Sequence, residues 1–150
     1  MNLAPDFRDL LEELGRDAVE FVLVGGYAVA FHGRPRATKD IDIFLVGTSE
    51  NLERAARAMD RFGAPKQVVA ALRSMTDNEV VFMGQPPMRV DFLRSVDGVT
   101  PADLFHSAVH AVLDGIAIKV ISREHLIANK RAAGRPQDLL DAEFLERTQR

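Results

Sequence analysis

The sequence lacks cysteine and tryptophan, has a single tyrosine, and contains no long uninterrupted hydrophobic run. Without cysteine there are no disulfides, no thiolate nucleophile and no thiolate zinc ligands, which fits a reducing compartment. With so few large aromatic residues, stacking surfaces for RNA bases are scarce. The longest apolar run, Phe21 to Phe31, contains two glycines and is too short to span a bilayer.

Charge and composition indicate an ordinary soluble protein. The formal net charge is −3, so the protein as a whole does not attract nucleic acid, and a polyanion would need a local basic cluster. The 150 residues are 47% hydrophobic and 27% charged, which is typical of one globular domain. The first stretch, MNLAPDFRDLLEEL, carries acids where a secretion signal is apolar. We therefore expect a single cytoplasmic domain over residues 1–150, with no membrane association.

The order of periodic segments predicts a mixed α/β (α+β) fold. Apolar residues at helical spacing follow Pro5, Gly15 can end that helix, and Val19 to Val24 reads as a buried strand. Two turn signals, GQPP and Asp114-Gly115, each predict an antiparallel pair. The strands of these pairs are Glu79–Met83 with Met88–Leu93, and Ala111–Leu113 with Ile116–Ile121. Ile41–Val46 is a further strand, and further helices are predicted over Tyr27–His32, from an N-cap at Ser49 to Phe62, over Pro65–Met75, Pro101–Ser107, Ser122–Ala133 and Pro136–Arg147. The prediction is a mixed sheet flanked by helices and closed by a C-terminal helical pair, not a doubly wound parallel sheet.

Two carboxylates open the strand DIDIFLV. Because side chains alternate across a strand, Asp40 and Asp42 project to one face and Ile41 to the other. Like charges near a core are costly unless a cation lies between them, and hard oxygen ligands favour Mg²⁺ or Mn²⁺ over zinc. The alternative is a strand end whose charges are solvated.

A third acid lies in the segment MRVDFL. If this strand pairs beside the first, Asp91 comes near Asp40 and Asp42. Three clustered carboxylates suit two cations about 4 Å apart, an arrangement used for in-line displacement at phosphorus.

Gly25 and Gly26 end a strand and open a helix, where unpaired backbone N–H groups and the absence of a side chain favour a phosphate. The following loop, GRPRATK, is predicted to bring Arg34, Arg36 and Lys39 to the same place. Taken alone, the glycine pair is also an ordinary turn, and the loop cations also fit a solvated loop.

Together, Gly25-Gly26, His32-Gly33, Arg36, Thr38 and Asp40-Ile41-Asp42, with Asp91 downstream, resemble the polymerase-β-type nucleotidyltransferase superfamily. The similarity is greatest to its small prokaryotic members, including those of abortive-infection and other toxin–antitoxin systems. A second block, LIANKRAAGRPQDLLDAEFL (residues 126–145), resembles the C-terminal helical pair of that family. One departure is Gly26, since many members carry Gly-Ser there.

The resemblance implies a nucleotidyltransferase fold that binds an NTP with Mg²⁺ (or Mn²⁺), transfers a nucleoside monophosphate to an acceptor hydroxyl and releases pyrophosphate. Asp91 would help to deprotonate the acceptor, Lys130 would reach the phosphates, and Asp138 could orient Lys130 or a neighbouring Arg. The implied metal and catalytic residues are Asp40, Asp42 and Asp91, and the implied nucleotide-binding residues are Gly25, Gly26, Arg36, Thr38, Lys39 and Lys130. The acceptor could be a tRNA, a protein or a small molecule, and its surface could come from a partner chain or a homodimer.

Two other functions use the same residues. A catalytically silent module could act through a partner, as an antitoxin or scaffold, although it would have no reason to keep three like charges together. A small metal-dependent nuclease could use the acids on phosphodiesters, but the glycine turn suits a triphosphate better. Outside this cluster, His32 is expected to make a structural hydrogen bond, and Lys119 to be an exposed strand residue.

Overall fold

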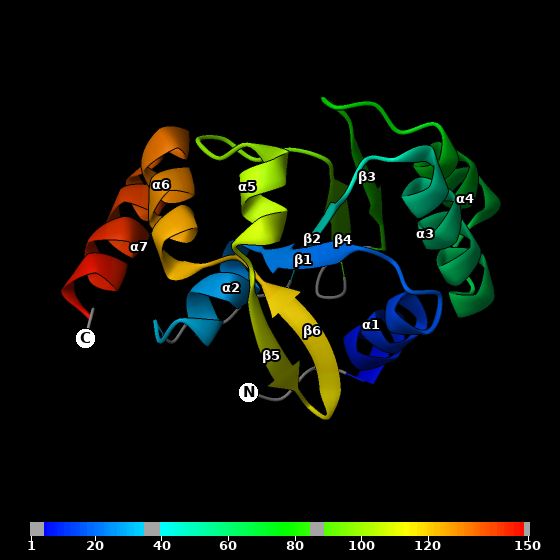
Figure 1. Cartoon of the computed structure of the whole chain (residues 1–150), viewed down its shortest axis with the longest axis horizontal. Helices are drawn as coiled ribbons and strands as arrows, with labels where there is room; N and C mark the ends of the chain where they lie inside the picture. The colour runs from blue at the N-terminus through cyan, green and yellow to red at the C-terminus, as the bar shows by residue number, and fades with distance from the viewer. Residues whose placement is uncertain (1–4, 35–39, 85–88, 149–150) are drawn as a thin grey trace.

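The computed structural model describes residues 5–34, 40–84 and 89–148. Within them, six strands form one sheet in the order β3-β4-β2-β1-β6-β5 (Figure 1). Neighbours β1–β2, β3–β4 and β5–β6 are antiparallel, whereas β2–β4 and β1–β6 are parallel. The strands are β1 Phe21–Val24, β2 Asp40–Leu45, β3 Val80–Met83, β4 Arg89–Leu93, β5 Val109–Leu113 and β6 Ile116–Val120. The predicted mixed sheet is confirmed.

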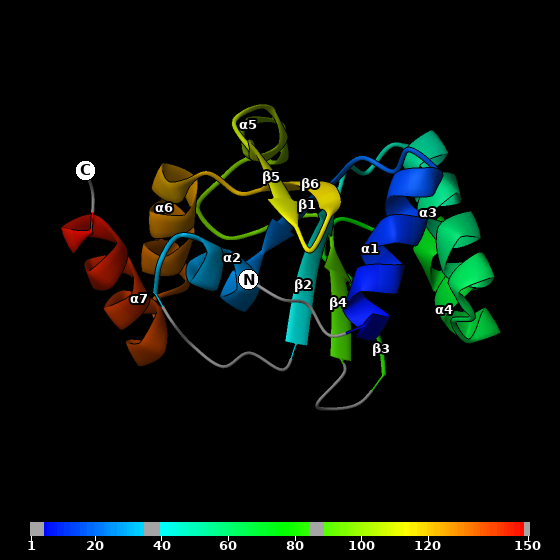
Figure 2. The same ribbon diagram turned by 90° about the horizontal axis from the view of Figure 1, so that it is seen from below.

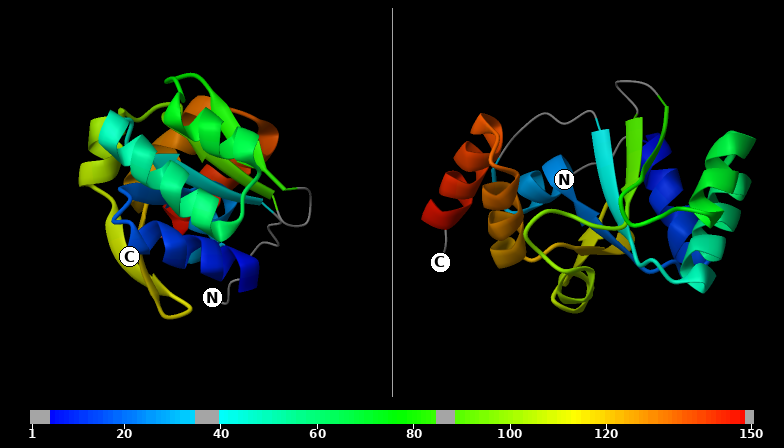
Figure 3. Two further views of the ribbon diagram at one scale, coloured as in Figure 1. Left: turned by 90° about the vertical axis from the view of Figure 1, so that its right-hand side faces the viewer. Right: turned by 90° about the horizontal axis from the view of Figure 1, so that it is seen from above.

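Helices cover the sheet from two sides. In Figure 2, α2, α6 and α7 lie on one side of the strands, and α1, α3 and α4 lie on the other. Figure 3 shows the same separation, with the α6–α7 pair at one end of the molecule and the α3–α4 pair at the other. The helices are α1 Pro5–Arg16, α2 Gly25–Phe31, α3 Ser49–Phe62, α4 Lys66–Arg73, α5 Pro101–His106, α6 Arg123–Ala133 and α7 Pro136–Arg147. None of the helices in the described ranges has the length and apolar character needed to cross a bilayer.

Alternation along β2 separates the core from the opposite face. Ile41 and Ile43 are fully buried, together with Phe92 of β4, whereas Asp40 and Asp42 are half-buried on the other face. The core side is filled by the apolar stripes of α1 and α3, whose residues recur at helical spacing. The aspartates therefore lie on the face that α3 does not cover.

Most predicted boundaries differ from the structure by one or two residues, and two of these differences have a clear local cause. The N-cap of α3 is Thr48, not Ser49, because Thr48 takes the extended conformation from which its hydroxyl accepts the Asn51 N–H. Helix α1 continues through Gly15 to Arg16, and the chain turns at Ala18, whose φ is 54°.

Both predicted strand pairs are observed. Val80 pairs with Leu93 in the antiparallel β3–β4 pair, although Gln85 to Pro87 of the predicted turn lie outside the described residues. The β5–β6 hairpin turns at Asp114 and Gly115, both with positive φ, as the Asp-Gly signal predicted.

Candidate functional site

Three acidic residues meet across β2 and β4. In the sheet register Asp42 lies opposite Val24 of β1 on one side and opposite Asp91 of β4 on the other. Asp40, two residues earlier, shares the same face. Burial raises the pKa of Asp42 to about 6, and the charges of Asp91 and Asp40 add to that rise, while Lys130 and Arg89 oppose it. The carboxylates are therefore close enough to repel one another, and the nearby cations balance that repulsion incompletely.

Gly25 provides the space in which the Asp42 carboxylate lies. Its φ is +69°, and a Cβ built on Gly25 would overlap Oδ2 of Asp42. Only glycine satisfies both conditions, the left-handed backbone and the close approach. The glycine pair that the sequence suggested for phosphate binding thus also positions an acidic side chain.

Two cations of the C-terminal helices face the acids. Lys130 of α6 is buried, and its Nζ lies 3.5 Å from Oδ1 of Asp138. The Nε of Arg135 donates to Oδ2 of Asp138 over 2.6 Å, and the Arg135 backbone N–H donates to the same oxygen over 3.2 Å. Burial alone would raise the pKa of Asp138, but these hydrogen bonds and charges hold it below its ordinary value. Asp138 thus fixes both cations at the edge of the site.

The acids and the cations line two adjoining pockets of about 390 and 290 Å³. Gly25, Asp42, Lys130 and Arg135 line both. The larger pocket extends along Asp91, Leu93, Ser95, Val96, Asp97, Asn129 and Ala133, and the smaller along Gly26, Asp40, Gln137 and Asp138. Acids on the sheet therefore face cations on the helices, as a phosphate–metal complex requires.

The donor set fits a hard cation that is completed by a substrate. In the described part of the chain, no three His, Cys, Asp or Glu side chains form a group that could hold a metal alone. Oδ1 of Asp91 instead accepts a hydrogen bond from Nε of Arg89 over 2.8 Å. Asp40 and Asp42, however, line the same pocket, and Mg²⁺ commonly takes one or two carboxylates plus substrate phosphates.

The structure brings together six of the nine predicted site residues: Asp40, Asp42, Asp91, Gly25, Gly26 and Lys130. The other three, Arg36, Thr38 and Lys39, lie outside the described residues.

The prediction for Arg34 is wrong. Its Nε lies 3.1 Å from Oδ1 of the fully buried Asp141, and its guanidinium stacks 5.1 Å from the centre of the Phe144 ring. Burying Asp141 requires a compensating cation, and this requirement directs Arg34 to α7. Sequence reasoning missed Asp141, although its spacing of three from Asp138 puts both acids on one face of a helix.

Of the two predictions made outside the cluster, one is confirmed and one is wrong. His32 makes its expected structural hydrogen bond, from Nε2 to the Ile121 carbonyl, at 2.7 Å. Lys119 is half-buried rather than exposed, because its Nζ packs 4.0 Å from the centre of the Phe105 ring.

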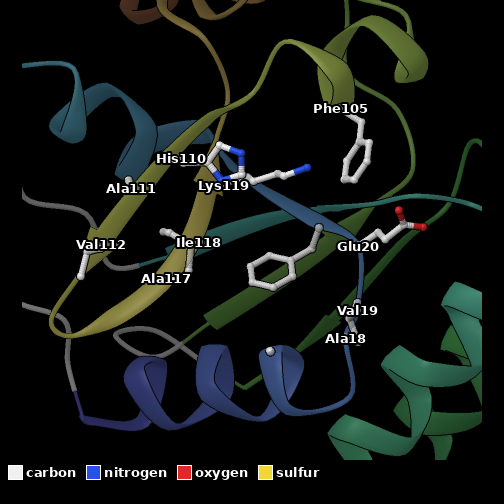
Figure 4. A pocket seen from close by; sticks show the side chains of 12 residues that line it. Ala18, Val19, Glu20, Phe105, His110, Ala111, Val112, Ala117, Ile118 and Lys119 are labelled. Carbon is white, nitrogen blue, oxygen red and sulfur yellow. The ribbon is translucent and has the colours of Figure 1, made fainter.

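A larger cavity, of about 590 Å³, lies at the other end of β1 (Figure 4). It opens because β6 shares only the Leu23–Val120 register pair with β1 and then diverges from it. In Figure 4 the Lys119 side chain, beside His110, points toward the Phe105 ring, and Glu20 lies below that ring in the view. Its lining includes a single carboxylate, Glu20. The two adjoining pockets around Asp42, where acids face cations, are therefore the candidate site.

Comparisons with known proteins identify the family and the fold. The family model "Nucleotidyl transferase of unknown function (DUF2204)" matches residues 4–150. A candidate nucleotidyltransferase (TM1012) from Thermotoga maritima aligns with a TM-score of 0.61 at 18% identity, covering 94% of this chain and 88% of that one. The antibiotic-resistance factor ANT(2'')-Ia aligns with a TM-score of 0.61 at 17% identity, covering 93% and 80%. The same factor in complex with adenylyl-2''-tobramycin gives 0.60 at 16% identity, covering 93% and 84%. No curated protein matches the sequence.

Proposed function

The chain belongs to the nucleotidyl transferase family DUF2204, and we propose that it transfers a nucleoside monophosphate from an NTP to an acceptor hydroxyl, releasing pyrophosphate. It is a transferase by family, and the donor, the metal and the acceptor are the proposed part. The observation that carries the proposal is the cleft in which Asp42, raised in pKa by burial and by its acidic neighbours, faces Lys130 and Arg135.

Asp40 and Asp42 are the proposed ligands for Mg²⁺ or Mn²⁺, with Asp91 completing the acidic group. When bound, such an ion neutralises phosphate charge and lowers the pKa of an attacking hydroxyl. Their half-buried position, away from the core, gives a metal–nucleotide complex access from the cleft.

The remaining residues bind and orient the triphosphate. Lys130 and Arg135 attract the phosphates from the helix side, while the backbone of Gly25 and Gly26 approaches from the sheet. No hydroxyl is available at position 26, so backbone N–H groups serve in its place. By the family resemblance, Arg36, Thr38 and Lys39 add further contacts to the nucleotide.

In the transfer step, Asp91 accepts the proton of the acceptor hydroxyl. The acceptor oxygen then forms a bond to the α-phosphorus, and the bond from that phosphorus to the bridging oxygen breaks. The electron pair leaves on the pyrophosphate, toward Lys130 and Arg135. Charge that develops on the leaving group therefore meets two fixed cations.

For the acceptor, we propose its reacting group, a hydroxyl, and the kinds of molecule that could carry it. One structural neighbour is a complex with adenylyl-2''-tobramycin, an adenylylated small molecule, and this supports the proposal of an ATP donor and a hydroxyl acceptor here. The proposed acceptor is a tRNA, a protein or a small molecule. The proposed compartment is the cytoplasm, and the proposed biological context is a toxin–antitoxin pair. One observation favours the second candidate, a silent module that acts through a partner. Arg89 forms an ion pair with Asp91, so the carboxylate of the proposed base is already engaged.

Pyrophosphate release tests the proposal. Wild-type protein incubated with Mg²⁺, each labelled NTP and a cell lysate should release pyrophosphate and label an acceptor, and Asp42→Ala should do neither. Asp60→Asn is the matched control, because Asp60 is an exposed acid on α3, in the helical layer opposite α6 and α7. Equal release by wild type and Asp42→Ala would refute the enzymatic proposal.

A further inference from the structure

Exposed apolar side chains lie directly beside the acidic cluster. Phe82 of β3 is opposite Asp91 in the antiparallel register, and Val80 is opposite Leu93, so these pairs share one face of the sheet. Val80 and Phe82 are 52% and 54% exposed, whereas Val81, on the other face, is buried. The open face of β3 therefore continues the candidate site past Asp91.

Arg89 connects this apolar surface to the acids. Its guanidinium carbon lies 4.4 Å from the centre of the Phe82 ring, and its Nε donates to Oδ1 of Asp91 over 2.8 Å. A flat cation thus stacks on a flat ring, and a carboxylate already balances its charge. Such a surface suits a neutral ring better than a phosphate, because aromatic rings stack on guanidinium planes and aromatic side chains alike.

The geometry of in-line displacement places the acceptor on this side. Attacking and leaving oxygens lie on opposite sides of the phosphorus, and the proposed pyrophosphate contacts, Gly25, Lys130 and Arg135, lie toward β1 and α6. The strand order β1, β2, β4, β3 leads away from them. In Figure 2, β2, β4 and β3 follow one another away from α6 and α7. An acceptor that attacks opposite the pyrophosphate therefore approaches over β4 and β3.

We propose that Val80, Phe82 and Arg89 form the acceptor subsite, and that the acceptor carries a flat heteroaromatic ring beside its hydroxyl, as a nucleoside does. This inference rests on the proposed function and names its substrate class. Phe82 and Asp91 lie on neighbouring strands, which are about 4.8 Å apart. If the base of a nucleoside stacks over Phe82 and Arg89, the hydroxyl of its sugar therefore lies above Asp91. Phe82 thereby supplies one of the few aromatic stacking surfaces in a chain without tryptophan.

The absence of tryptophan allows a direct binding test. Phe82→Trp makes position 82 the single tryptophan of the chain, and its fluorescence reports what stacks there. The donor site is first saturated with Mg²⁺ and a non-hydrolysable ATP analogue. Adenosine should then quench the tryptophan in a saturable manner, while mannitol and methyl glucoside should leave it unchanged. Phe62→Trp, on α3 in the opposite layer, is the matched control and should respond to none of them.

A second pair of variants tests whether this surface contributes to transfer. Phe82→Ala should bind Mg²⁺ and the ATP analogue like wild type in calorimetry, yet lose at least tenfold in adenosine-dependent pyrophosphate release. Phe82→Tyr should keep most of that activity, because it keeps the ring. Val112→Ala, which truncates an exposed apolar residue on β5, should behave like wild type.

The outcomes separate this inference from the proposed function. If wild type binds no Mg²⁺–nucleotide, the proposed function itself fails. If it binds nucleotide but adenosine does not quench Phe82→Trp, or the non-aromatic polyols quench it equally, the acceptor subsite is overturned. A dinucleoside monophosphate distinguishes the source of the ring: tighter quenching than by adenosine assigns it to a nucleic-acid end, and equal or weaker quenching assigns it to a free nucleoside.

Discussion

Asp42 on β2 is half-buried and Asp138 on α7 is buried, and their pKa values shift in opposite directions. Asp138 has Lys130 and Arg135 within hydrogen-bonding distance, and its pKa falls. Asp42 has two acidic neighbours, and its pKa rises to about 6. The first carboxylate is satisfied by the protein itself. The second carries an electrostatic cost that a bound cation would remove, which is the physical reason to propose a metal site at β2 rather than at α7.

The largest expected difference between the two acids is in catalysis. Asp42→Asn should lower nucleotidyl transfer by about 10³-fold or more, because it removes a proposed metal ligand at the reacting phosphate. Pyrophosphate release under saturating Mg²⁺ measures the loss. Retention of more than a tenth of the wild-type rate would mean that Asp42 is not a metal ligand.

For stability, the substitution at Asp138 should be more damaging than the substitution at Asp42. Asp138→Asn should lower the free energy of unfolding by about 3 kcal/mol, because it leaves the buried Lys130 without its carboxylate partner. Chemical denaturation at neutral pH measures this change. A variant as stable as wild type would show that α6 and α7 do not depend on the pair, and the contrast with Asp42 would disappear.

The close contact between Gly25 and Asp42 gives a sharper comparison. Gly25→Ala should reduce transfer by about 10²-fold, because the new methyl group displaces the Asp42 carboxylate. Gly63→Ala is the control: Gly63 also has positive φ, at +103°, but a Cβ there meets nothing within 4 Å. It should cost only about 1 kcal/mol of stability and leave activity intact. Equal activity losses in the two variants would show that backbone strain, not Asp42, explains the effect.

The smallest effect concerns pH. The folded-state pKa of Asp42 is above its ordinary value, so the folded protein holds that proton more tightly than the unfolded chain does between about pH 4 and pH 6. The contribution of Asp42 therefore makes the protein less stable as pH rises through this window, by about 1–2 kcal/mol after allowance for solvent screening. Asp42→Asn should remove this slope and be more stable than wild type at pH 8. Urea titrations at pH 4, 6 and 8 measure it, and parallel pH profiles for the two proteins would contradict the shift.

Local sequence signals predicted the elements whose determinants are close in sequence. The Asp114-Gly115 turn, the alternation in DIDIFLV and the strand pair around GQPP each encode their own geometry, and all three are present. The sequence left open whether β4 pairs beside β2; the structure shows that it does, and this pairing brings Asp91 to Asp42.

Features that depend on distant contacts were not accessible in the same way. Arg34 belongs to a basic loop in the sequence, but the cost of burying Asp141, more than 100 residues away, directs it to α7. Helix α7 also reverses the usual pattern, since Asp138 and Asp141 face inward while Leu139 and Leu140 are about half exposed. Apolar periodicity alone therefore could not identify the inner face of this helix.

We propose that the acids of β2 and β4 form a metal–nucleotide site. Calorimetric titration of wild type and Asp42→Asn with a non-hydrolysable NTP, each with and without Mg²⁺, tests it most directly. We expect binding heat for wild type with Mg²⁺ and none for the other three titrations. Absence of heat for wild type with Mg²⁺, or equal heat for Asp42→Asn, would contradict it.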